Sequence, residues 1–117
     1  MELTDKNYEK IIKNNDKPVI IDFYTQMCGS CQILGDMIDK RLYAYAEENG
    51  VQIAMCDVSH NPKLANAFKI DAVPFTIAVM PDEKLKFPEI GLREEAYYYK
   101  IIDKLAGKGG FFSKLFG

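Results

Sequence analysis

Two cysteines separated by two residues are the strongest chemical signal in this sequence. Cys28-Gly29-Ser30-Cys31 follows shortly after an apolar run at residues 19–24. Thiols at this spacing can close a disulfide within one turn and reopen it by exchange with another protein. The residues after Cys31 show helical periodicity, so Cys28 is predicted to lie at a helix N-terminus, where free backbone N–H groups and the helix dipole stabilise a thiolate. The pattern predicts a redox site with Cys28 as its nucleophile.

The second cysteine is predicted to have a different role from the first. Cys31 lies one turn into the predicted helix, so we expect it to be more buried and to have a higher thiol pKa. It is then the resolving thiol, which attacks Cys28 in a mixed disulfide. The residues alone also allow a static disulfide or a pair of metal ligands. A static bridge across so short a loop would stabilise the fold little, because loop-closure entropy grows with loop length.

A zinc site would need ligands beyond the cysteine pair. Cys56 and His60, the single histidine, would complete a Cys₃His set with Cys28 and Cys31. The predicted helix after Cys31 and the predicted strand around Cys56 point these ligands apart, so we predict no metal and no organic cofactor. Cys56 is instead expected to pack in the core, because free cysteine is among the most buried residue types. His60 is expected in a solvated loop before Pro62.

The elements that must position the cysteines alternate between helix and strand. The strand at residues 19–24 is apolar on both faces, which predicts a central position with helices on each side. Periodicity, caps and breakers predict helices at residues 3–14, 28–48, 62–68 and 93–106, and strands at residues 19–24, 51–58, 75–80 and 85–90. A very short first strand before Thr4 stays open. Tyr97, Ile101 and Leu105 are expected on one face of the last helix. This order predicts an α/β fold with one central sheet and helices on both faces.

Bulk properties exclude several classes of function. At 117 residues the chain is one domain, and its formal net charge of −2 gives no basic patch for nucleic acid. No apolar stretch approaches the roughly 20 residues that span a bilayer. The N-terminus is polar and lacks the apolar region of a secretory signal, so a cytoplasmic location is expected. Three cysteines are too few for a structural disulfide framework, which favours reactive chemistry.

Over nearly all of residues 3–105 the sequence resembles the thioredoxin family. The resemblance rests on an acid-bearing strand, the cysteine motif, an Asn-Pro that opens a helix, a Val-Pro before a strand and a glycine after the last strand: Asp22-Phe23-Tyr24, Cys28-Gly29-Ser30-Cys31, Asn61-Pro62, Val73-Pro74 and Gly91. It implies a thioredoxin fold for residues 1–106, a central mixed β-sheet flanked by helices on both faces. It also implies that Pro74 is cis and faces the cysteine pair.

Four positions depart from the family pattern. Met27 stands where the family has tryptophan, Ser30 where it has proline, Asp36 where it often has proline, and Met55 where a lysine lies near the buried acid. These changes bear on the redox potential and the set of partners more than on the fold or the type of reaction. The hydroxyl of Ser30 can hydrogen-bond the thiolate of Cys28, which would stabilise the reduced form.

The resemblance also assigns roles around the cysteines. Asp22 is implied to be a buried acid behind the pair, with a pKa raised above about 3.9 by desolvation, and able to accept the proton of Cys31. The alternative is a solvated acid at a strand end. The residues predicted to bind substrate flank the pair, and the Val73 backbone is expected to pair with an extended segment of the substrate. They are Met27, Gly29, Ser30, Val73, Pro74 and Gly91.

The predicted function is a thiol-disulfide oxidoreductase that reduces protein disulfides through Cys28 and Cys31. Its expected partners are proteins with disulfides and a thioredoxin reductase or another low-potential electron donor, and it is expected to be a monomer. Two alternatives stay open: a disulfide oxidase or isomerase, and a redox-silent module that binds a partner through the groove at Pro74. A measured reduction potential would distinguish a reductase from an oxidase or isomerase. An insulin-turbidity assay would distinguish a reductase from a redox-silent module.

The C-terminal residues form a separate segment in this prediction. Residues 107–117 are interpreted as a flexible glycine-rich link, Gly107–Gly110, followed by the apolar tail Phe111–Phe116. The tail is either without function or docks on this chain or on a partner. Contact with a membrane surface is a less favoured alternative, because one short apolar segment anchors weakly.

Overall fold

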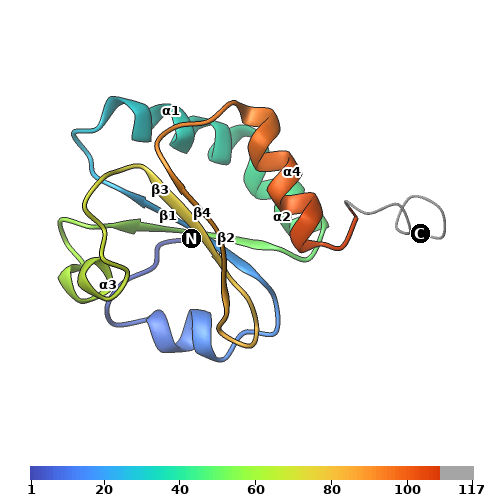
Figure 1. The fold of residues 1–117 in the computed structure, drawn as a ribbon, viewed down its shortest axis with the longest axis horizontal. Coiled ribbons are helices and arrows are strands. Elements are labelled where there is room, and N and C mark those ends of the chain that lie inside the picture. The colour runs from blue at the N-terminus through green and yellow to red at the C-terminus, as the bar shows by residue number, and fades with distance from the viewer. Residues whose placement is uncertain (109–117) are drawn as a thin grey trace.

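Strand β1 (Val19–Tyr24) lies at the centre of the sheet, as its apolar residues predict. In this computed structural model, which describes residues 1–108, β1 pairs in parallel with β2 (Gln52–Asp57) and antiparallel with β3 (Phe75–Val79). The order β2-β1-β3-β4 makes a mixed four-stranded sheet, with β4 (Leu85–Ile90) at one edge (Figure 1). Every β1 residue except Tyr24 is buried, because helices cover both faces.

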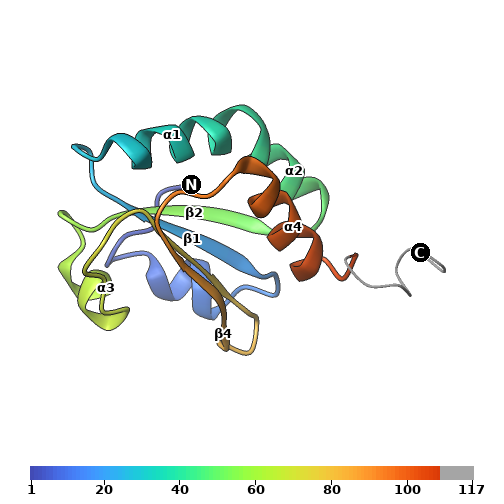
Figure 2. The ribbon, with the colours of Figure 1, turned by 45° about the horizontal axis from the view of Figure 1, so that its top comes forward.

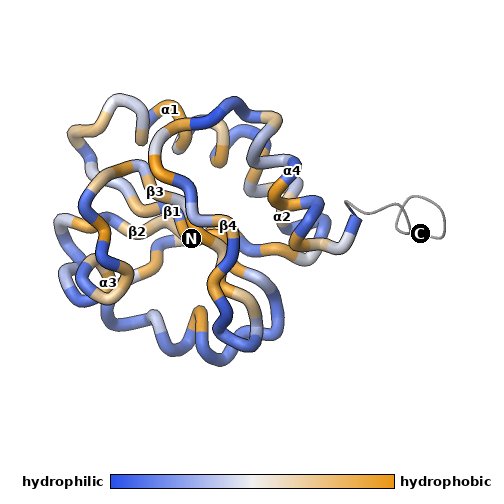
Figure 3. The backbone as a smooth tube through the Cα atoms, viewed as in Figure 1, coloured by the Kyte–Doolittle hydropathy of each residue, from blue (hydrophilic) through white to orange (hydrophobic). Residues whose placement is uncertain are grey.

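The helices form two layers around this sheet. Figure 1 and Figure 2 show α1 (Gly29–Met37), α2 (Tyr43–Glu48) and α4 (Glu95–Leu105) together on one face, with α3 (Pro62–Ala67) and the N-terminal helix on the other. Alternate residues of β1 point to opposite faces. Each face therefore has its own apolar cluster, and hydrophobic residues follow the strands in the middle of the molecule (Figure 3).

The helix that follows the cysteine motif has a π-helical turn in its middle. The chain runs through α1, the π-helical turn η2 (Ile38–Leu42) and α2 without a break. The sequence predicts one helix over residues 28–48, and that extent is confirmed. Gly50 follows the helix with a φ of 72°, a conformation that favours glycine.

The predicted N-terminal helix over residues 3–14 is wrong at its beginning. The π-helical segment η1 covers only Glu9–Lys13. Glu2 instead forms a parallel bridge with Met55 at the outer edge of β2, and the Leu3 N–H donates to the Met55 carbonyl at 2.7 Å. The edge of β2 carries backbone groups that need partners, and this segment supplies them.

The N-terminus of α3 is capped by a residue far away in the sequence. Pro62 occupies the first turn, as predicted, but the side chain of Asn61 makes no capping hydrogen bond. The carboxylate of Asp5 accepts hydrogen bonds from the backbone N–H groups of Lys63 and Leu64 at 3.1 and 2.9 Å. This contact ties the N-terminal segment to α3.

The last helix packs Tyr97, Ile101 and Leu105 against one apolar cluster, as their predicted common face implies. Tyr98, Ile101 and Ile102 are its buried residues, whereas Tyr97 and Leu105 are only partly buried. The helix is tied to the layer formed by η2 and α2 by two side-chain contacts. Arg41 donates to both carboxylate oxygens of Glu95 at 2.6 and 2.9 Å, and the Tyr45 hydroxyl donates to Asp103 at 2.6 Å.

The described chain ends just after α4. Gly107 has a φ of 77°, and its N–H donates to the Lys104 carbonyl at 3.2 Å. The predicted tail Phe111–Phe116 and the rest of the glycine-rich link lie outside the described residues. Within residues 1–108, no helix has both the length and the apolar character needed to cross a membrane.

Candidate active site

The two cysteines lie where β1 passes into α1. Cys28 is the N-cap residue of α1, and its Sγ accepts a hydrogen bond from the Cys31 N–H at 3.2 Å. The two residues are joined by a disulfide, with their Cα atoms 5.2 Å apart. Cys31 is buried, with 3% of its surface exposed, and Cys28 is half-buried. The predicted difference in exposure between the two thiols is confirmed.

The Ser30 side chain reaches the sulfur of Cys28. Its Oγ lies 3.4 Å from the Sγ of Cys28, within hydrogen-bond distance for sulfur. Gly29, between the two, is exposed, and a side chain there would meet no atom within 4 Å. At the N-terminus of a helix the hydroxyl and the free N–H groups act in the same direction, because both stabilise negative charge on sulfur.

The predicted substrate-binding residues from distant parts of the chain meet at Cys28. The Val73–Pro74 bond is cis, as the family resemblance implies, and the Val73 carbonyl oxygen lies 3.9 Å from the Cys28 Sγ. The Gly91 N–H donates to the Pro74 carbonyl at 2.7 Å, and its φ of 91° favours glycine. The structure therefore brings Val73, Pro74 and Gly91 together beside the pair.

Exposed apolar side chains lie near the cysteines in the sequence and next to Gly91. Met27, which precedes Cys28, is 95% exposed. Ile33 on α1 and Ile90, which precedes Gly91, are also exposed large apolar side chains. Their exposure is not apparent from the sequence, because single apolar residues in a helix or strand are normally interpreted as core.

Asp22 is fully buried in the centre of β1. It is 0% exposed, and within the described residues neither of its carboxylate oxygens has a hydrogen-bond partner. In register it lies between Met55 of β2 and Thr76 of β3. Burial, and secondarily the negative charge of Glu2, raises the pKa of Asp22 to about 7. The alternative of a solvated acid at a strand end is therefore wrong.

A hollow lies beside the sulfur of Cys31. It has a volume of about 340 Å³, and its lining includes Cys31, Gly35, Tyr24 and Met55. Met55 is the register partner of Asp22 on β2, so the hollow reaches the strand neighbour of the buried acid.

The other titratable groups weighed for a metal site lie apart from the pair. Cys56 is 0% exposed and packs on the sheet face opposite α1, and burial raises the pKa of its thiol to about 12. The side chain of His60 is 73% exposed, and its Nδ1 lies 3.0 Å from an oxygen of Asp57. Within residues 1–108, no group of three or more His, Cys, Asp or Glu side chains could hold a metal ion. The predicted core position of Cys56 and the solvated position of His60 are confirmed.

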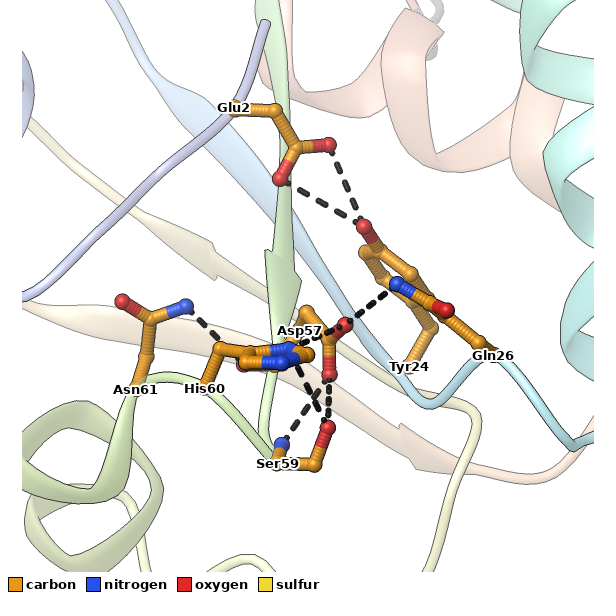
Figure 4. Close-up of polar contacts among 7 residues, drawn as sticks. All are labelled: Glu2, Tyr24, Gln26, Asp57, Ser59, His60 and Asn61. Atoms are coloured by element: carbon orange, nitrogen blue, oxygen red, sulfur yellow. Dashed lines mark hydrogen bonds and ion pairs between the residues drawn. The ribbon is translucent and has the colours of Figure 1, made fainter.

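A polar network beside the hollow was not found from the sequence. Figure 4 shows Asp57 at its centre, accepting hydrogen bonds from the Ser59 hydroxyl at 2.6 Å, the Ser59 N–H at 3.0 Å and the Gln26 amide at 3.3 Å. Burial alone would raise the pKa of Asp57, but the hydrogen bonds from Ser59 and the contact with His60 hold it below its usual value. Near this network, and drawn with it in Figure 4, the Tyr24 hydroxyl contacts the carboxylate of Glu2 as a separate pair. A run of polar residues after a strand is the only signal in the sequence.

Comparisons with known proteins agree with this geometry. The family described as Thioredoxin matches residues 1–104. A thioredoxin of Chlorobaculum thiosulfatiphilum is 32% identical over 106 residues, covering 91% of this chain and 95% of that protein. Thioredoxin 2 of Chlorobaculum tepidum is 30% identical and covers 91% and 94%. The mitochondrial thioredoxin of Mus musculus is 30% identical over 103 residues, and the match covers 86% of this chain but 59% of that protein.

Proposed function

The chain belongs to the thioredoxin family and is a thiol-disulfide oxidoreductase, and we propose that it reduces protein disulfides with Cys28 as nucleophile and Cys31 as resolving thiol. The observation that carries this assignment is the unequal placement of the two sulfurs. Cys28 caps α1 and is half-buried, whereas Cys31 is buried inside the first turn. Only the capping sulfur combines access with stabilisation of the thiolate.

The proposed reaction has two exchange steps. The Cys28 thiolate attacks one sulfur of the substrate disulfide, forms a mixed disulfide and releases the other substrate sulfur as a thiolate. Cys31 then loses its proton and attacks the Cys28 sulfur. The bond between Cys28 and the substrate breaks, the second substrate thiolate leaves, and the Cys28–Cys31 disulfide forms. Two electrons pass to the substrate, and a low-potential donor must return the pair to its reduced form.

We propose that Asp22 accepts the proton that Cys31 loses in the second step. Its pKa of about 7 makes it a base that is partly ionised at neutral pH. A group with a pKa near the working pH is the most effective general base. The hollow beside Cys31 and Met55 is large enough for water, which supports transfer through a water molecule as well as direct transfer.

The groove around the pair is proposed to bind an extended segment of the substrate. The Val73 backbone next to Cys28 supplies groups for strand pairing, and the exposed Met27 supplies apolar contact. The full proposed set is Met27, Gly29, Ser30, Val73, Pro74 and Gly91.

Family members take electrons from reductases and act on protein disulfides, and we propose a thioredoxin-reductase-type donor for this chain. We also propose that it acts as a monomer in the cytoplasm, where a reducing environment keeps substrate thiols reduced. Fractionation of cells that express a tagged chain tests the location, and light scattering of the purified chain tests the monomer.

A trapping experiment tests the roles of the two cysteines. In Cys31→Ser the first attack still occurs but release is lost, so mixed disulfides with substrates should accumulate when external thiols are kept low. The matched control is Cys28→Ser, which should capture far fewer proteins because Cys31 is buried. Equal capture by both variants would contradict the assignment. A reduction potential near about −270 mV would support a reductase, and one near about −120 mV an oxidant.

A further inference from the structure

Two carboxylates lie on one face of the sheet, separated by a single side chain. Glu2 pairs with Met55, and Met55 pairs with Asp22. Residues in register on neighbouring strands point to the same face, so Glu2, Met55 and Asp22 form a row across the sheet. Neighbouring strands are about 4.8 Å apart, which places the backbones of the two acids about 10 Å apart.

The carboxylate of Glu2 is held in this row. The Tyr24 hydroxyl lies 3.2 and 3.4 Å from its two oxygens and donates to it (Figure 4). Tyr24 is two residues from Asp22 on β1 and therefore points to the same face. The backbone of the segment is fixed by the hydrogen bonds that Leu3 and Met55 make across the edge of β2.

The surroundings of Asp22 provide little to offset a nearby negative charge. Within residues 1–108 its carboxylate has no hydrogen-bond donor, and the side chain between the two acids is the uncharged Met55. The titratable or charged groups on the elements packed around it come from the N-terminal segment, β1, α1, β2, β4 and α4. They are Glu2, the Met1 ammonium bound to the Ile53 carbonyl, Tyr24, Cys31, Asp57, Tyr98 and Glu89. Glu89 lies in the same row beyond Thr76, but it pairs with Arg93 at 3.1 Å, which offsets its charge.

We propose that Glu2 is a positioning residue for the resolving step: its carboxylate, held by Tyr24 in register with Met55 and Asp22, disfavours ionisation of Asp22 and so sets the pH at which Asp22 can take the proton of Cys31. This inference rests on the role proposed above for Asp22 and extends it to a second carboxylate. The elevated pKa of Asp22, to which the charge of Glu2 contributes after burial, is consistent with it. The charge acts at a distance and touches neither sulfur.

Direct titration of Asp22 tests the electrostatic part. The side-chain carboxyl carbon of Asp22 can be followed by NMR against pH in the oxidised chain and in Glu2→Gln, whose amide oxygen can still accept from Tyr24. We expect the midpoint in Glu2→Gln to be lower by roughly 0.5–1 pH unit, the size expected for one charge at about 10 Å in a protein. Glu2→Asp keeps the charge and should titrate nearer to the unchanged chain than to Glu2→Gln.

Two controls separate this effect from a structural one. Glu9→Gln removes a glutamate that pairs with Lys13 on the opposite face of the sheet, and it should leave the Asp22 midpoint unchanged. Because Glu2 is exposed, the difference between Glu2→Gln and the unchanged chain should shrink as salt rises from about 0.05 to about 1 M. A midpoint that does not move in Glu2→Gln, or that moves equally in Glu9→Gln, would overturn the inference.

The resolving step provides the functional part of the test. A mixed disulfide of Cys28 with thionitrobenzoate releases a coloured thiolate when Cys31 attacks, and stopped-flow absorbance gives the rate at each pH. The pH midpoint of this rate should move down in Glu2→Gln by the same amount as the NMR midpoint. In Asp22→Asn the additional change Glu2→Gln should have no effect on the profile.

The two proposals fail in different ways. If the NMR midpoint moves but the release profile is the same in the unchanged chain and in Asp22→Asn, the role of Asp22 as base is wrong, and the role of Glu2 in that step is wrong with it. If Asp22→Asn alters the release profile but Glu2→Gln moves neither midpoint, Asp22 keeps its role and only the inference about Glu2 is overturned.

Discussion

Asp22 and Asp57 are both buried on neighbouring strands, and burial raises the pKa of each, yet their net pKa shifts have opposite signs. Asp22 is 0% exposed and its pKa is raised to about 7, whereas Asp57 is 5% exposed and its pKa is held below the usual value. Asp57 lies at the end of β2, where the next turn provides the N–H and hydroxyl of Ser59. Asp22 lies mid-strand, where the backbone donors are used by the sheet. The hydrogen bonds to Asp57 outweigh the effect of its burial, whereas nothing among the described residues offsets the burial of Asp22.

The largest expected effect comes from removing the charge of Asp22, whose carboxylate has no hydrogen-bond donor among the described residues. Asp22→Asn should raise the free energy of unfolding at pH 8 by about 2–3 kcal/mol, because ionising the buried carboxyl is costly and the unpartnered amide that replaces it is less so. Urea unfolding of the oxidised chain measures this change. Equal stability of the two chains at pH 8 would show that Asp22 is solvated or paired in solution.

Asp22 should also make the free energy of unfolding depend on pH, by nearly the same amount as the change expected for Asp22→Asn. Its folded pKa of about 7 lies above the ordinary value of 3.8, so its penalty is absent at low pH, grows as pH rises from about 4 to 7 and is constant above. Between pH 5 and 8 the unfolding free energy should therefore fall by about 2–3 kcal/mol from this group. The matched control is Asp22→Asn, in which this fall should be missing.

The second acid should respond in the opposite sense. Asp57→Asn should lower the free energy of unfolding at pH 7 by about 1–2 kcal/mol, because the charge-assisted bonds from Ser59 and His60 are weakened. The pKa of Asp57 is lowered, so its stabilisation is present above the ordinary value and is lost as pH falls below about 4. The difference between the unchanged chain and Asp57→Asn should narrow in acid; a constant difference would contradict the assignment.

The smallest effect should come from removing one of the hydrogen-bond donors of Asp57. Ser59→Ala deletes the hydroxyl that donates to Asp57 at 2.6 Å but keeps the backbone N–H bond. We expect a loss of about 0.5–1 kcal/mol and a rise in the pKa of Asp57, measured by urea unfolding and by NMR titration.

Local patterns predicted much of the fold. The hairpin strand β4 begins and ends at the predicted residues, and the helix after the cysteines has the predicted extent, because periodicity, a turn and a terminal Gly50 are signals within a few residues of the element they define. The first strand was predicted to be central because its residues are apolar on both faces. These are properties of neighbouring residues and need no knowledge of the rest of the chain.

Contacts between distant residues account for the wrong predictions. The helix predicted from residue 3 begins only at Glu9, because the open edge of β2 pairs with the segment around Glu2 as a strand. Asn61 precedes Pro62 as a cap should, but the carboxylate of Asp5 caps α3 instead. Tyr98 and Ile102 are buried more deeply than Tyr97 and Leu105 in α4, since the depth of each residue depends on the layer that the helix packs against. Periodicity cannot choose between such partners.

The sequence by itself determined the reacting pair. Cys28 and Cys31 are three residues apart, so a helix that begins between them places one sulfur at its N-terminus and one inside its first turn whatever the rest of the fold. The tertiary structure decided the state of the acids. Whether Asp22 lacks donors, whether Asp57 has them and whether Glu2 lies in the same row depend on strand register between segments far apart in the chain, and a carboxyl pKa follows from those neighbours.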